Sequence, residues 1–493
     1  MVVKTAFLAT FIQVFLPFFL ARLGRLQFAF KPLFLFVKKG LFFLIFSFLH
    51  YPVQGQNRVP VFGSKDDSIN YAKQVYQLQE AWRNPQNTRR IDSMSSAHYS
   101  WLKDRVIRYR TSYSPSHGFT VYTQKPPPRS VTRLSLYNFK GKTLPDSLLL
   151  FENLVELELL NTKIKKIPKK LGRLTNLKKI SLFNNRPSGN LRIAGNSRIE
   201  TLVIRDDEFN KLPRRFHKLK NLKSLDLSRN NLSYFPDISG CKSLRTLLLN
   251  DNKISLQKMR GKVQSLEVLT LTSNAITRVP GSIGGFTGLK KLNLSSNQIT
   301  EIAPEIGRLE SLEELMLYKN NITELPGTIY QLKKLKVIDL YHNQIKQFDS
   351  AISNWSNMEI LYAANNQLYS LPESIGSLRQ LRELYVHHNR LSTIPETVGL
   401  LDSLRVLRLN DNFLIELTNS LYKLKKLENL DISNNQIRNL PEAVFDFPQL
   451  KLLSLQQNPF DASFHTEISK WAEKASQERK VVVHLDHKEF ERD

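Results

Sequence analysis

The chain has 493 residues, of which 41% are hydrophobic and 23% charged, a balance that excludes a disordered chain. Its formal net charge is +27, and +21 (27 − 6) remains without residues 1–55, which hold six basic residues and no acid. Such an excess favours contact with something anionic, or it only keeps a long surface soluble. The single cysteine, Cys241, excludes an intrachain disulfide and therefore disulfide-bonded end caps.

The first 55 residues contain an apolar run at 5–21 and a second one at 41–49. The second run follows two lysines and precedes small or modest residues, which is the pattern of a secretory signal cleaved before Gln56. It is too short to cross a bilayer. We therefore expect an exported protein (periplasmic, at the cell surface or secreted) and place residues 1–37 upstream of the true start. The alternative takes the first residue as the start, so that the run at 5–21 is a membrane segment that anchors the chain.

Residues 56–130 carry two helical patterns, at 68–82 and 99–109, followed by three consecutive prolines. Apolar residues line one side of the first pattern, as in a helix that covers a core. We expect this region to form a helical N-terminal cap or small module.

From residue 131 onward the phrase L-x-L-x-x-N returns every 22 or 23 residues. So regular a spacing over fifteen units indicates a solenoid, in which each unit packs only on its neighbours. The first inward residues of the units are Leu134, Leu157, Ile180, Leu202, Leu225, Leu247, Leu269, Leu292, Leu315, Ile338, Leu361, Leu384, Leu407, Leu430 and Leu453.

The units resemble leucine-rich repeats of the 23-residue class, L-x-x-L-x-L-x-x-N-x-I-x-x-L-P-x-x-I-x-x-L, which occurs in bacterial proteins and in Ras-associated scaffolds. The resemblance covers residues 131–459. It implies an α/β fold, a leucine-rich repeat solenoid curved like a horseshoe, with a parallel concave sheet, short helical or irregular convex segments and caps without disulfides. It also implies non-enzymatic binding of a protein or peptide, without indicating which one.

The residue type at each fixed position of the repeat can also be explained physically, independently of the resemblance. Alternation, as in Leu315-Met316-Leu317, makes a short strand whose leucines point inward. The following asparagine can satisfy backbone groups where the strand ends, because its amide both donates and accepts. Proline, as in Pro326, fixes the backbone at the first turn of a convex segment. The predicted asparagine ladder is Asn230, Asn252, Asn274, Asn297, Asn320, Asn343, Asn366, Asn389, Asn412, Asn435 and Asn458.

Residues 460–493 are expected to form a C-terminal cap. Phe464, Ile468, Trp471 and Ala475 fall on one helical face, and the run at 481–485 indicates a final strand. A solenoid needs such a cover because its last unit otherwise exposes an apolar face.

The outward residues of the strands form the concave face, where neighbouring strands lie about 4.8 Å apart. In the middle of the array these positions are rich in tyrosine and histidine, which predicts a recognition site built from rigid rings and hydroxyls. The alternative is that the tyrosines only stack on cross-strand neighbours. The predicted ligand-binding residues are Met316, Tyr318, Asp339, Tyr341, His342, Tyr362, Tyr385, His387, Arg408 and Asn410.

No pattern indicates an enzyme, a cofactor or a metal. His342 and His387 come from units two apart, so about 10 Å separates their backbones and a shared ion would be strained. Cys241 takes the place of a core leucine, as a small buried hydrophobic residue does. A glycine-rich phosphate loop is missing.

A basic flank, most of which lies outside the strands of the first units, consists of Lys163, Lys165, Lys166, Lys169, Lys170 and Arg173, then Lys211, Arg214, Arg215, Lys218 and Lys220. It suits an anionic polymer or a membrane surface, or it is only a solvated face. Aromatic interleaving is lacking, so no specific nucleic acid is expected.

The leading hypothesis is a monomeric, exported protein that binds a protein or peptide through its concave face. Two alternatives stay open. One is a cell-envelope adhesion or structural protein that holds anionic glycans or lipid, and the other is an intracellular signalling scaffold.

Overall fold

The structure, a computed structural model, describes residues 113–114, 118–119 and 131–485, apart from 138, 140, 165, 186–191, 194–197, 213–215, 217–218, 261–262 and 441. All of these belong to one compact unit, residues 99–493. The predictions for residues 1–55, and the helices at 68–82 and 99–109, lie outside the described residues. Within 56–130 the structure describes a short antiparallel pair, β1 (Tyr113–Ser114) and β2 (Gly118–Phe119).

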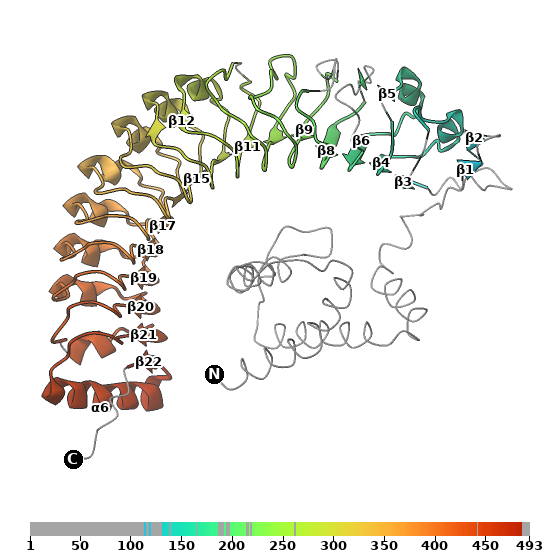
Figure 1. Ribbon diagram of the computed structural model, residues 1–493. Coiled ribbons are helices and arrows are strands. Elements are labelled where there is room, and N and C mark those ends of the chain that lie inside the picture. Colours follow the sequence, from blue (N-terminus) through green and yellow to red (C-terminus); the bar gives the residue numbers. More distant parts are fainter. Residues whose placement is uncertain are drawn as a thin grey trace, which may run out of the picture. The chain divides into compact units, whose positions relative to one another are not determined.

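Sixteen strands form one parallel sheet, and each pairs with the strand one unit further along the chain (Figure 1). Fifteen of them open the fifteen predicted units, and the sixteenth belongs to the C-terminal end. They are β3 (Arg133–Tyr137), β4 (Glu156–Leu160), β6 (Lys179–Phe183), β8 (Thr201–Arg205), β9 (Ser224–Asp226), β10 (Thr246–Leu248), β11 (Val268–Thr270), β13 (Lys291–Asn293), β15 (Glu314–Met316), β16 (Val337–Asp339), β17 (Ile360–Tyr362), β18 (Glu383–Tyr385), β19 (Val406–Arg408), β20 (Asn429–Asp431), β21 (Leu452–Ser454) and β22 (Val482–His484).

The strand register stacks the inward leucines into one continuous core. Leu315 is the partner of Leu292 on one side and of Ile338 on the other. The second inward leucines, such as Leu317 and Leu340, are fully buried. Because each unit buries its apolar side chains only against its neighbours, the core runs along the solenoid as a spine.

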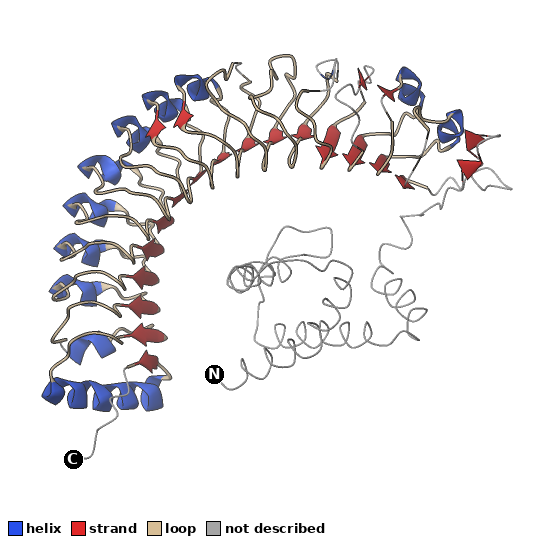
Figure 2. Cartoon of the chain, viewed as in Figure 1, coloured by secondary structure: helices blue, strands red, loops and turns tan. Residues whose placement is uncertain are grey.

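The convex side is made of short 3₁₀ helices, while the strands line the inner edge of the curve (Figure 2). Proline introduces several of these 3₁₀ helices, as the sequence pattern predicts. Pro326, Pro372 and Pro395 lie in extended backbone at the residue before the helix, whereas Pro304 is the first residue of its helix. The described 3₁₀ helices are η2 (Asp146–Leu150), η3 (Lys169–Arg173), η5 (Gly281–Gly285), η6 (Pro304–Arg308), η7 (Gly327–Gln331), η8 (Ser350–Asn354), η9 (Glu373–Ser377), η10 (Glu396–Leu400), η11 (Asn419–Lys423) and η12 (Glu442–Phe445). Two-residue parallel pairs join β5 (Lys166–Ile167) to β7 (Arg192–Ile193) and β12 (Arg278–Val279) to β14 (Glu301–Ile302).

The asparagine ladder links consecutive units, as its chemistry predicts. The Asn343 amide nitrogen donates to the carbonyl oxygens of Leu317 and Leu340, both at 3.0 Å. Its amide oxygen accepts the backbone N–H of Ile322 at 3.1 Å. One side chain therefore satisfies groups of two neighbouring units at the point where the strands end.

The residue before each ladder asparagine adopts a left-handed backbone conformation, as does the equivalent residue in the units that begin at Leu157, Ile180 and Leu202, with φ between 49° and 59°. This bend turns the chain away from the sheet immediately after the outward strand positions. His342 and His388 occupy this position, with φ of 55° and 50°. Their side chains therefore lie at the rim of the concave face rather than on the strands.

The C-terminal end carries the helix α6 (Ala462–Arg479) and the strand β22, which pairs with β21. Ile468 and Ala475 are buried, and Trp471 packs against Phe445 and Phe464 with ring centroids 5.7 and 5.9 Å apart. The apolar helical face found in the sequence thus covers the last repeat. Among the described residues, no helix has both the length and the apolar character needed to cross a membrane.

Candidate functional site

The predicted site residues lie in three adjoining columns of the concave face. The strand column holds Met316, Asp339, Tyr362, Tyr385 and Arg408, which are successive partners in the strand register. The second column holds the residue that directly follows the second inward residue of each unit, for example Tyr318 after Leu317. The turn column holds the next residue, which has left-handed backbone. The second column contains Tyr318, Tyr341, Ala364, His387 and Asn410, and the turn column contains Lys319, His342, Asn365, His388 and Asp411. We call the ten predicted residues the tyrosine–histidine strip.

The four tyrosines form two separate stacked pairs rather than one row. Tyr318 stacks on Tyr341 in the second column, with ring centroids 5.9 Å apart and 25° between the planes. Tyr362 stacks on Tyr385 in the strand column, at 4.9 Å and 28°. The pairs lie in different columns because the tyrosine occupies different positions in the repeat. Tyr341 lies three residues after the first inward residue of its unit, whereas Tyr362 lies one residue after it. All four rings are half-buried.

The histidines connect the two pairs. His387 lies 5.7 Å from the ring of Tyr341 and 6.3 Å from that of Tyr385. The first of these contacts spans the unit of Ala364, which is fully buried and too small to hold the two rings apart. His342, at the rim, makes a T-shaped contact with Tyr341, with ring centroids 4.5 Å apart. The result is one aromatic surface across four consecutive units.

The charged and polar groups of the strip are partly satisfied within it. Arg408 forms an ion pair with Asp431 of the next strand at 2.5 Å. The Tyr385 hydroxyl donates to Glu383 at 2.9 Å, and the Asn410 amide donates to Asp411 at 2.6 Å.

Burial shifts the titration of several strip residues. It lowers the pKa of His387 to about 4, with help from the neighbouring His388 and Arg408. Burial also lowers the pKa of His342 and raises the pKa values of Tyr341, Tyr362 and Tyr385. At neutral pH the two histidines and the three tyrosines are therefore uncharged.

Family models for leucine-rich repeats match the chain along most of the solenoid. "R13L1/DRL21 LRRs" matches residues 89–185, "Leucine rich repeat" matches residues 197–254, 257–299 and 402–460, and "Leucine-rich repeat region" matches residues 280–393. The chain is a leucine-rich repeat protein. The first of these matches begins within the segment 56–130.

Solved structures share the fold of this leucine-rich repeat protein. A leucine-rich repeat protein of Leptospira interrogans is 29% identical, with a TM-score of 0.58, and the match covers 73% of this chain and 96% of that one. The Toll–Spatzle complex of Drosophila gives 21% identity and a TM-score of 0.56, over 67% of this chain and 48% of that one. No curated protein matches the sequence.

Nothing in the described part of the leucine-rich repeat protein is arranged for metal binding, since no three His, Cys, Asp or Glu side chains come together. The thiol of Cys241 is buried in the core, and this burial raises its pKa to about 11. A thiol in that state is a poor nucleophile.

A second apolar area of the concave face was not among the predicted site residues. Leu160 and Phe183 are partners on adjacent five-residue strands, and Val203 and Leu248 point outward from later strands. All four are half-buried. Reading the outward positions from the first unit, instead of from the middle of the array, would have found them.

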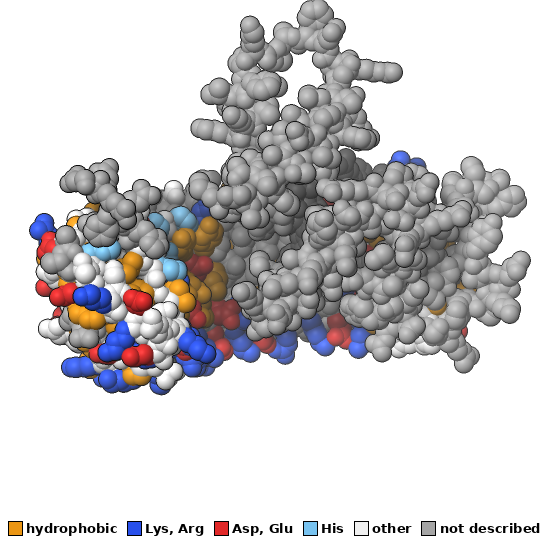
Figure 3. Space-filling model, turned by 90° about the horizontal axis from the view of Figure 1, so that it is seen from below, with side chains coloured by type: hydrophobic (Ala, Val, Ile, Leu, Met, Phe, Trp, Pro, Cys, Tyr) orange, Lys and Arg blue, Asp and Glu red, His pale blue; other side chains and the backbone are white. Residues whose placement is uncertain are grey.

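The residue just before the strand is charged in many units, and its sign often changes from one unit to the next. Glu200 pairs with Lys223, Glu313 with Lys336 and Glu428 with Lys451, at 2.7 to 2.8 Å. Figure 3 shows basic and acidic side chains gathered together along one edge of the described surface. These pairs compensate part of the basic charge at this position of the repeat.

The described members of the basic flank lie on the convex side and the adjoining loops. Lys170 pairs with Asp146, whereas Lys163, Lys166, Lys169 and Arg173 are exposed without an ion pair among the described residues. Lys165, Arg214, Arg215 and Lys218 lie outside the described residues.

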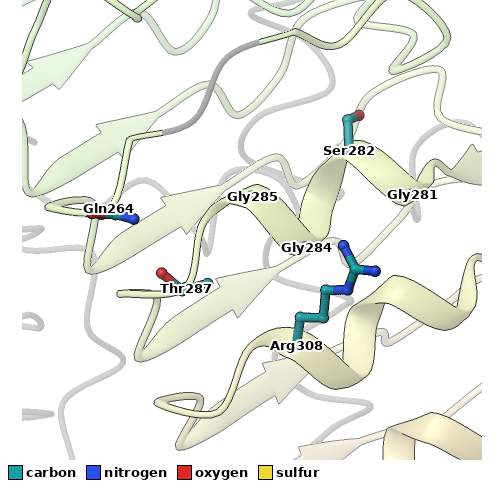
Figure 4. A pocket seen from close by; sticks show the side chains of 7 residues that line it. All are labelled: Gln264, Gly281, Ser282, Gly284, Gly285, Thr287 and Arg308. Atoms are coloured by element: carbon teal, nitrogen blue, oxygen red, sulfur yellow. The ribbon is translucent and has the colours of Figure 1, made fainter.

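A further depression on the convex side lies between η5 and η6. In Figure 4 the Arg308 side chain extends from η6 toward the glycines of η5. The residues that line this depression are Gln264, Gly281, Ser282, Gly284, Gly285, Thr287 and Arg308. With one charged side chain and little apolar surface, it offers a ligand far less than the concave strip does.

Proposed function

We propose that the tyrosine–histidine strip binds an extended segment of a protein or peptide, and that the chain has no catalytic role. The observation that carries this proposal is the joined set of half-buried rings, Tyr318 with Tyr341 and Tyr362 with Tyr385, bridged by His387. Rigid rings give large contact area with little loss of rotamer freedom, and their hydroxyls and ring nitrogens can bond to a peptide backbone.

The residues around the strip support a local binding site rather than a concave face that is apolar along its whole length. The preceding units present Thr270, Thr272, Asn293 and Ser295 at the same outward positions, and the following unit presents Ser433. A surface of small polar side chains offers less apolar area to a ligand. Among solved structures of this fold, Toll is found in complex with Spatzle, so a solenoid of this kind can serve as a protein-binding surface.

The test is replacement of one tyrosine from each stacked pair, Tyr341→Ala with Tyr362→Ala, in the full chain. Peptides selected from a random display library on the unmodified chain serve as probes. We expect affinity to fall about 10- to 100-fold, because central aromatic residues carry most interface energy. Titration calorimetry measures the change.

The matched control removes two tyrosines that lie outside the strip, Tyr234→Ala with Tyr369→Ala. These side chains are exposed, at 37% and 50%. Equal losses in both double variants, or no loss in the strip variant, would contradict the proposal. Circular dichroism confirms that both variants remain folded.

A second surface is favoured by the exposed, unpaired side chains of the basic flank, which suit an anionic glycan or lipid. Binding of that kind weakens steeply with salt, because exposed charges are screened over about 10 Å at 0.1 M. Binding to heparin or to anionic vesicles that is lost at high salt, and that survives the two strip substitutions, would favour this surface over the strip.

We also propose that the chain is exported, after cleavage near Gln56, and acts as a monomer. The basis is the pattern of two lysines, a short apolar block and small residues that ends at residue 55. Intact mass of the purified protein would show whether residues 1–55 are removed.

A further inference from the structure

The aspartates in the strand column of the concave face differ in whether they form an ion pair. Asp226 and Asp431 lie in the strand column, and each forms an ion pair with an arginine of the preceding unit, Arg205 and Arg408. Asp339 lies in the same column without such a partner among the described residues. The fold therefore neutralises two of these carboxylates and leaves the third one open.

Asp339 is placed between the two tyrosine pairs. Its register partners are Met316 on one side and Tyr362 on the other. One carboxylate oxygen accepts the backbone N–H of Tyr341 at 3.0 Å, and no described residue donates to the other. The side chain is half-buried, and this desolvation raises the pKa of its carboxyl. Burial raises the pKa values of the Tyr341 and Tyr362 hydroxyls, and the charge of this carboxylate adds to both shifts.

The charged neighbours leave this carboxylate uncompensated. Lys319, in the turn column of the preceding unit, is exposed and forms no ion pair with it. Arg408 is held by Asp431, and Glu383 is a further acid that accepts from Tyr385. A desolvated carboxylate without a cation is unfavourable, and aromatic faces attract cations through their quadrupoles.

Building on the proposed function, we propose that Asp339 receives a lysine or arginine side chain of the bound protein segment. The charged head pairs with the free carboxylate oxygen, and the aliphatic stem packs against the rings of Tyr341 and Tyr362. An arginine can in addition lay its planar guanidinium on a tyrosine face. The histidines, uncharged at neutral pH, do not repel such a cation.

The test compares Asp339→Asn with the full unmodified chain in the same peptide-display selection. The substitution keeps an oxygen that can accept from Tyr341 and replaces the free carboxylate oxygen by an uncharged NH2 donor, which cannot pair with a cation. We expect peptides selected on the unmodified chain to be enriched in lysine or arginine, and their affinity for Asp339→Asn to fall about 10- to 100-fold. Replacing the enriched basic residue by norleucine should cause the same loss, with little further loss when both changes are combined.

The control is Asp251→Asn, which removes a charge from an exposed position of the turn column in an earlier unit. Peptides without enriched basic residues, an equal loss in Asp251→Asn, or an unchanged affinity for Asp339→Asn would overturn the inference. A selection that yields no peptide would overturn it as well. If peptides lose affinity for the tyrosine variant but not for Asp339→Asn, the proposed function stands and the cation site fails. If neither variant loses affinity, both fail.

Discussion

His387 illustrates how the concave face changes the chemistry of a single residue. Its ring lies between those of Tyr341 and Tyr385, and its Nδ1 atom is buried without a hydrogen-bond partner in the described structure. Burial holds its pKa near 4, whereas the ordinary value is 6.5. The folded protein therefore resists protonation of this ring, while the unfolded chain does not.

This difference predicts a loss of stability in mild acid. Between pH 6.5 and pH 4 the unfolded chain binds a proton at His387 that the folded chain does not bind, so the free energy of unfolding falls as pH falls. The variant His387→Gln should weaken this pH dependence, and urea unfolding at several pH values in that window measures it. An unchanged slope in the variant would show that other groups are responsible. The glutamates of the charged edge, such as Glu313, have pKa values lowered from 4.5 by their lysine partners, so their contribution is lost from about pH 4.5 downward and overlaps only the acid end of this window.

Some of the short convex elements need glycine where they closely approach the next unit. A Cβ atom at Gly307 of η6 would lie 2.6 Å from the carbonyl oxygen of Thr328 in the next unit. The equivalent atom at Gly327 of η7 would meet nothing within 4 Å. What the neighbouring unit places against the glycine therefore decides whether glycine is required.

Gly307→Ala should lower the free energy of unfolding by about 1–3 kcal/mol, because the added atom forces the two units apart. Gly327→Ala, one unit further on, should be neutral or slightly stabilising, because it restricts the unfolded chain without a clash. Chemical denaturation of the two variants gives the comparison. Equal effects would mean that the close approach at Gly307 relaxes freely.

At the scale of the whole molecule, the solenoid is a stack whose stability resides in contacts between neighbours. The sheet, the asparagine ladder and the charged edge all join residues about one unit apart. Such a stack has two open ends, and α6 covers the C-terminal one through the rings of Phe445, Phe464 and Trp471.

Trp471→Ala should therefore loosen the C-terminal units before the central ones. Because Trp471 is half-buried, we expect a cost of about 2 kcal/mol, below the range for fully buried rings. Hydrogen exchange should show faster exchange in β21 and β22, with little change in β15 and β16. Lys474→Ala, an exposed change on the same helix, is the control and should leave exchange unaltered. Uniform acceleration along the sheet would contradict this local picture.

The spacing of the leucines and asparagines alone determined the fold, the strand register and the spine. These contacts repeat with the period of the chain, so a residue type that recurs at a fixed interval must occupy a fixed place in the stack. The outward position of the strip residues follows from the same alternation along each strand.

Only the tertiary structure decided how the strip is assembled. The separation of the tyrosines into two pairs, the meeting of Tyr341 with His387 across the unit of Ala364, and the unpaired state of Asp339 depend on side-chain directions in several units at once. The arginines that neutralise Asp226 and Asp431 likewise come from neighbouring strands. Arg205 lies in the second column, whereas Arg408 lies in the strand column. The repeat period assigns each residue to a column, but the distance between side chains in different columns is set by rotamers and by the curvature of the sheet, which the period does not contain.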